Sequence, residues 1–94
     1  MRTVMLDGRK MADQEEFHRL VAEVMDFPAW YGGNLDALYD CLTEVGEDTQ
    51  IFFCHLEEMQ ASLGGYTQKV LSVFFDAQEE NEYLAVALLG EDED

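Results

Sequence analysis

The sequence predicts an α/β fold in which a three-stranded parallel sheet is packed with about four helices. Three short apolar runs, at residues 3–6, 50–54 and 83–89, have the length and composition of strands. Segments with helical spacing separate them, and continuously apolar strands are typical of a parallel sheet covered by helices. A chain of 94 residues suits one small domain. We therefore expect a single domain over residues 1–90 and an acidic disordered tail over residues 91–94.

A strand and a helix are expected before Pro28. The apolar run at residues 3–6 ends at a turn-forming Asp-Gly pair. Asp13 is a suitable N-cap for the helix that follows, and Pro28 ends that helix at residues 26–27 because the residue before a proline avoids helical angles. Its apolar residues recur at helical spacing and form one face: Phe17, Leu20, Val21, Val24 and Met25. His18 lies outside this set and is expected at the surface.

A second helix is expected from Asn34, an N-cap residue that follows two loop glycines, to Val45. Its core side carries Leu35, Leu38, Cys41, Leu42 and Val45. Its other side carries Asp36, Tyr39, Asp40 and Thr43. Asp36 and Asp40 are four residues apart, and like charges at this spacing weaken an isolated helix by a few tenths of a kcal/mol. An exposed aromatic residue among such acids is typical of a surface that binds a cationic partner.

The remaining segments alternate between strand and helix. A buried strand at residues 50–54 precedes a short helix at residues 56–63, which a glycine pair ends. A longer helix follows from Thr67 to about Glu80, and the last strand covers residues 83–89. Both cysteines fall inside apolar patterns, which indicates buried thiols in a reducing compartment rather than a disulfide.

Charge is the strongest compositional signal, with 5 Lys and Arg against 21 Asp and Glu and a formal net charge of −16. Nucleic acids and anionic membranes would be repelled, whereas a basic protein surface or a cation would be attracted. The charge could also serve solubility alone. No apolar run approaches the roughly 20 residues of a membrane span. The N-terminus lacks the pattern of a secretion signal, so we expect a cytoplasmic protein.

The sequence offers only weak candidates for a catalytic or metal-binding site. Cys54 and His55 could pair as nucleophile and base, but adjacent residues of a strand point to opposite faces. The cysteines and histidines lack the spacing of zinc ligands. Asp36 and Asp40 could do acid–base chemistry only in a cleft that raises one pKa, for which a helix face offers little room. We expect a binding protein without enzyme activity, cofactor or metal.

The segment "FPAWYGGNLDALYDCLTE" resembles the signature of the barstar family of intracellular ribonuclease inhibitors. That signature is roughly Pro-x-aromatic-Tyr-Gly-x-Asn-Leu-Asp-Ala-Leu-aromatic-Asp-Cys-Leu. The matching residues are Pro28, Tyr31, Gly32, Asn34, Leu35, Asp36, Ala37, Leu38, Asp40, Cys41, Leu42 and Thr43. Weaker similarity covers the opening strand, the first helix and "VLSVFFDAQEE", and so nearly the whole chain. The family fold, three parallel strands with packed helices, agrees with the predicted one.

The resemblance implies that the second helix and the loop before it plug the active site of a basic, extracellular-type ribonuclease similar to barnase. Asp40 would stand in for a substrate phosphate, and Asp36 would pair with further cations. The implied partner-binding residues are Trp30, Tyr31, Gly32, Asn34, Asp36, Tyr39, Asp40, Thr43, Glu44 and Asp76. The implied complex is a 1:1 heterodimer, and the free chain is expected to be a monomer.

The chain departs from the family pattern at several of these positions. The best-known pattern has Tyr at Trp30, Trp at Tyr39, Glu at Asp76, and Gly-Trp where this chain has Glu44 and Val45. An alternative function is therefore a barstar-like module that binds another basic protein or toxin without inhibiting a ribonuclease.

Overall fold

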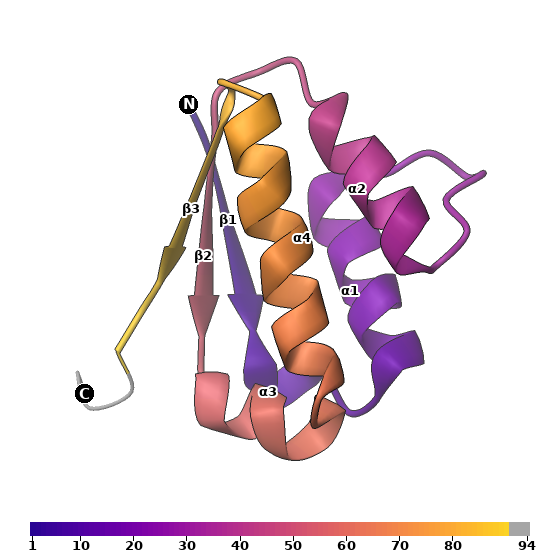
Figure 1. Cartoon of the computed structure of the whole chain (residues 1–94), viewed down its shortest axis with the longest axis vertical. Coiled ribbons are helices and arrows are strands. Elements are labelled where there is room, and N and C mark those ends of the chain that lie inside the picture. The colour runs from indigo at the N-terminus through magenta and orange to yellow at the C-terminus, as the bar shows by residue number, and fades with distance from the viewer. Residues whose placement is uncertain (91–94) are drawn as a thin grey trace.

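The computed structural model describes residues 1–90, which form one three-stranded parallel sheet and four α-helices (Figure 1). In chain order the elements are β1 (Arg2–Asp7), the 3-10 helix η1 (Gly8–Lys10), α1 (Gln14–Met25), α2 (Leu35–Thr43), β2 (Thr49–Cys54), α3 (Leu56–Leu63), α4 (Tyr66–Glu80) and β3 (Leu84–Leu88). The strand order is β1-β2-β3. The predicted α/β class is therefore confirmed. The tail expected at residues 91–94 lies outside the described residues.

The helices lie on one face of the sheet (Figure 1). Side chains alternate between the two faces along each strand. Those that face the helices are buried, as with Val4 and Leu6 of β1 and Ile51 and Phe53 of β2. Met5, on the opposite face, is 49% exposed. The helical cover that the apolar runs predicted is thus present on one face only.

The core between sheet and helices is built around large aromatic side chains. Phe17 of α1 and Phe74 of α4 are fully buried, as is Phe53 of β2. Phe53 and Phe74 meet edge to face, with ring centroids 4.9 Å apart. Full burial of a side chain of this size contributes roughly 1.5–3 kcal/mol. The contact fixes α4 on the sheet, and α2 in turn packs against α4.

Helix α2 is two residues shorter than predicted, and its last turn is closed by backbone bonds from Glu44 to Cys41 and from Val45 to Leu42 and by the side chain of Asn81. It ends at Thr43 instead of Val45. The buried amide of Asn81 donates from Nδ2 to the carbonyl oxygens of Leu42 and Val45, at 3.0 and 2.9 Å. Its Oδ1 accepts from the backbone N–H of Tyr83 at 2.9 Å. Asn81 therefore links the ends of α2 and α4 to the start of β3.

His18 is buried, so the expectation of a surface position is wrong. Its side chain is 6% exposed and lies between two tyrosines. Nδ1 is 2.5 Å from Oη of Tyr31, and Nε2 is 2.7 Å from Oη of Tyr66. Both ring nitrogens thus have partners, which removes the usual cost of burying a polar group.

Within residues 1–90, no helix combines the length and hydrophobicity needed to cross a membrane. The two cysteines, Cys41 and Cys54, are not joined by a disulfide. Cys41 is buried, as expected, and Cys54 is half-buried.

Candidate functional site

Helix α2 presents the two aspartates that the sequence singled out. Asn34 caps the helix, with Oδ1 accepting from the backbone N–H of Ala37 at 2.8 Å. Leu38 and Leu42 are fully buried beneath the helix. This packing fixes the rotation of α2 and leaves Asp36 and Asp40 exposed on its outer side.

A groove of about 670 Å³ lies between α2 and α4. Its polar lining consists of five carboxylates: Asp36, Asp40, Asp76, Glu79 and Glu80. Leu35, Tyr39 and Val73 supply the apolar lining. In the part of the chain that the structure describes, no ion pair involves any of these five carboxylates. We call this feature the acidic groove; its chemistry suits a partner that brings several cations.

The acidic groove brings together four of the predicted partner-binding residues: Asp36, Tyr39, Asp40 and Asp76. It also includes Glu79 and Glu80, which the sequence analysis did not single out. Their spacing from Asp76, three and four residues along one helix, places them on the same face and was a usable signal. The sequence pattern did not predict that α4 packs beside α2.

The two candidate aromatic residues lie in different environments. Tyr39 was predicted to be exposed, and this is wrong, because its side chain is half-buried and packs against the core where α4 approaches α2. Trp30 is 62% exposed, on the loop before α2. Of these two aromatic residues, Trp30 is therefore the exposed one.

Contacts of Tyr31 with the preceding residues hold the loop before α2 in place. Tyr31 donates its backbone N–H to the carbonyl oxygen of Pro28 at 3.0 Å, and its ring packs against Phe27 at a centroid distance of 5.0 Å. Burial raises the pKa of Tyr31 well above its usual range, so its hydroxyl stays protonated. With Gly32 and His18, Tyr31 lines a separate hollow of about 410 Å³.

Two other predicted residues lie outside the acidic groove. Thr43 donates from Oγ1 to the carbonyl oxygens of Tyr39 and Asp40, both at 3.0 Å, and so closes the end of its own helix. Glu44 lines a different hollow, of about 260 Å³, on the other side of α2.

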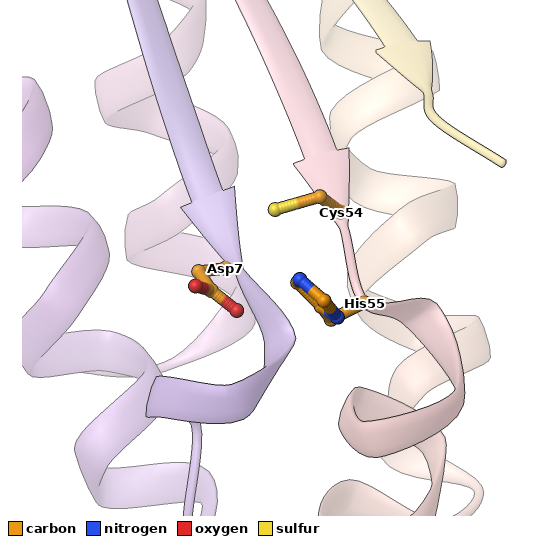
Figure 2. Close-up of side chains that lie close together, drawn as sticks. All are labelled: Asp7, Cys54 and His55. Carbon is orange, nitrogen blue, oxygen red and sulfur yellow. The ribbon is translucent and has the colours of Figure 1, made fainter. Parts of the chain in front are cut away.

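A second group of side chains combines donors that metals bind. Asp7 ends β1, Cys54 ends β2 and His55 follows, and Figure 2 shows the three side chains converging. Their potential ligand atoms all lie within 4.8 Å of one another. Cys54 and His55 do not point to opposite faces of a strand as predicted, because β2 ends at Cys54 and His55 has a left-handed backbone, with φ of 54°.

Comparison with known proteins gives the family. Residues 1–89 match the family described as Barstar (barnase inhibitor). The chain is also 41% identical over 81 residues to a protein of Bacillus subtilis (strain 168) named "Putative ribonuclease inhibitor YrdF", covering 85% of this chain and 89% of that protein. Members of this family are inhibitors rather than enzymes. The chain therefore belongs to the barstar family, as its α2 segment predicted.

Proposed function

We propose that the chain inhibits a barnase-like ribonuclease by placing α2 and the loop before it into the basic active site of that enzyme. The observation that carries the proposal is the acidic groove, where five carboxylates meet and none of them forms an ion pair within residues 1–90. A ribonuclease must hold a polyanion, so its active site gathers basic side chains. The two surfaces are complementary in charge, which favours both rapid association and specificity.

Asp40 is the residue that we assign to the position of an RNA phosphate. It lies in the middle of α2, exposed, with Asp36 one turn before it on the same side. Asp76 faces both across the groove. Trp30 supplies an aromatic anchor at the loop. A substrate phosphate and Asp40 would compete for one site, so inhibition should raise the apparent KM for RNA.

This function fits a cytoplasmic immunity protein whose residues 1–90 act as one domain and neutralise a toxin in a 1:1 complex. The free chain would be a monomer. Support comes from the family to which the chain belongs and from its net charge of −16. A basic protein without nuclease activity would meet the same charges, and the test below distinguishes the two.

The test is an inhibition assay against a panel of barnase-like ribonucleases, with Asp40→Asn and Glu57→Gln compared in parallel. Both substitutions remove one negative charge, but Glu57 lies on α3, outside the acidic groove. We expect inhibition to weaken strongly for Asp40→Asn and to stay near wild type for Glu57→Gln. Equal inhibition by the two variants would rule out this face. Inhibition of no ribonuclease, with retained binding to a non-nuclease basic protein, would favour the alternative function.

A further inference from the structure

The carboxyl ends of β1 and β2 bring together three different metal-binding side chains. Asp7 and Cys54 are register partners across the parallel pair, so their side chains leave the sheet on the same face. His55 is the next residue, and its left-handed conformation returns the imidazole toward them (Figure 2). All three side chains are half-buried, which leaves the group open to an ion from solution.

The backbone around this group is tightly constrained. A Cβ atom on Gly8 would lie 2.1 Å from the backbone oxygen of His55. Glycine at position 8 therefore permits the end of β1 to touch the start of α3. This close approach, together with the strand register, fixes the three residues relative to one another before any ligand binds.

We infer that Asp7, Cys54 and His55 form a binding site for a thiophilic divalent cation, with Zn²⁺ as the best match. A thiolate, an imidazole and a carboxylate are the three ligand types that zinc takes in proteins, and three protein ligands plus water complete a tetrahedral site. Soft sulfur together with nitrogen disfavours Mg²⁺ and Ca²⁺, which prefer oxygen. This inference concerns residues outside the acidic groove and does not rest on the proposed function.

The geometry requires only small side-chain movements. Zinc ligands at tetrahedral angles are about 3.3–3.8 Å apart, whereas the ligand atoms here lie within 4.8 Å of one another. Side-chain rotations that move the ligand atoms by about 1 Å close that difference. Oε1 of Glu58 lies 3.8 Å from Nδ1 of His55 and supplies a carboxylate that can orient the ring from outside the site.

Arg9 is a neighbour whose charge opposes a cation at this site. Its guanidinium donates to both carboxylate oxygens of Asp7, and its side chain is 59% exposed. A carboxylate has about four lone-pair positions, so one oxygen can bind Arg9 and the metal together. Alternatively, the exposed arginine side chain can turn into solvent. Neither outcome disturbs the backbone that holds the three ligands.

The test is a titration of the purified chain with Co²⁺, which reports thiolate ligation through a charge-transfer absorption and tetrahedral geometry through visible bands. We expect one Co²⁺ per chain and displacement by one equivalent of Zn²⁺. Cys54→Ser should abolish the charge-transfer band. Cys41, buried in α2, remains present in that variant and so serves as an internal control for the other thiol.

Two further variants keep the local fold while removing a ligand. His55→Asn retains a residue that tolerates the left-handed conformation. Asp7→Asn retains the oxygen that accepts from the backbone N–H of Arg9. Each should weaken Co²⁺ binding by more than the roughly 10–100-fold that loss of an outer-shell partner costs. A missing charge-transfer band in the wild type, an unchanged band in Cys54→Ser, or one Co²⁺ per two chains would overturn the inference.

Discussion

His18 and Tyr31 are joined by a 2.5 Å hydrogen bond between Nδ1 and Oη, which ties α1 to the loop before α2. The other ring nitrogen bonds to Tyr66 at the start of α4. A neutral imidazole has one donor and one acceptor nitrogen, so one phenol donates to His18 and the other accepts from it. The loop that carries Trp30 is thereby held in one conformation in the free chain, so the binding proposed for it would cost less conformational entropy.

Removing the Tyr31 hydroxyl should destabilise the fold. In Tyr31→Phe, a buried nitrogen of His18 loses its partner, at a cost of about 1–3 kcal/mol in the free energy of unfolding. Tyr83→Phe is the matched control, since Tyr83 is 42% exposed and its change should stay within about 0.5 kcal/mol. Urea denaturation measures both. Equal unfolding free energies for the two variants would contradict the role assigned to the His18 bond.

Stability should fall as the pH drops below the ordinary range of histidine. Burial lowers the pKa of His18 in the folded state. As the pH falls, His18 therefore takes up a proton in the unfolded chain before it does so in the folded one. The stability associated with neutral His18 is fully present above about pH 6.5 and is lost progressively below it. Unfolding free energies between about pH 8 and pH 5 should decrease in wild type and change less in His18→Gln. Asp7 has a lowered pKa through its bonds from Arg9, but it contributes only at more acidic pH.

Parallel pH dependence in wild type and His18→Gln would show that another group is responsible. The groups near this imidazole are the phenols of Tyr31 and Tyr66 and the charged Glu15 and Arg19, which line the same hollow as His18. Burial raises the pKa of both phenols, so neither ionises in this range.

Asp40→Ala should separate binding from stability. Leaving a partner's buried cations unpaired typically costs 2–5 kcal/mol or more in binding. In the free chain the same change removes a repulsion with Asp36 and adds a strong helix former, so stability should rise by a few tenths of a kcal/mol or more. Thermal melts and dissociation constants for the cognate ribonuclease measure the two effects. Binding within about threefold of wild type would show that Asp40 is not at the interface.

Two further alanine variants calibrate that result. Asp36→Ala should weaken binding less than Asp40→Ala, and it should raise stability less, because the favourable negative charge that it removes from the first turn of α2 offsets the relieved repulsion. Glu44→Ala, at the rim, should cost less than about 1 kcal/mol in binding. A larger loss for Glu44 than for Asp40 would move the interface to the other side of α2.

Association with the ribonuclease should slow as salt is added. Electrostatic steering by a chain of net charge −16 raises the association rate, and ions screen it. We expect the rate constant to drop roughly tenfold or more from low to high ionic strength, with a smaller change in the dissociation rate. Stopped-flow measurements across a salt series provide the check. A rate constant independent of salt would exclude steering by these charges.

Asn81→Ala should loosen the link between α2 and α4. The carbonyl oxygens of Leu42 and Val45 would lose their donor, which should cost roughly 1–3 kcal/mol in unfolding free energy. Glu82→Ala, at an exposed neighbouring position, is the control and should change stability by less than about 0.5 kcal/mol. Chemical denaturation compares them, and a neutral Asn81→Ala would contradict this role.

Local patterns predicted most of the fold, because strands and helices follow from spacing that a single segment carries. Residues whose environment depends on distant partners were not predictable in this way. His18 is buried because Tyr31 and Tyr66 reach it from elsewhere in the chain. Tyr39 is half-buried because α4 docks beside α2, and the same docking assembles the acidic groove. The side chain of His55 lies beside that of Cys54 because His55 has a left-handed backbone conformation, which the alternation of side chains along a strand does not predict.

The three-stranded sheet also has a consequence for how copies of the chain behave in concentrated solution. With the order β1-β2-β3, the two outer strands each have one edge without a neighbouring strand among the described elements. Such edges can template intermolecular pairing, and Met5 and Leu88 add exposed apolar surface there. Mutual repulsion between highly negative molecules opposes this aggregation. The acidic composition thus also protects the chain from aggregation through its sheet edges. This protection should weaken as the pH approaches the isoelectric point near 4.1.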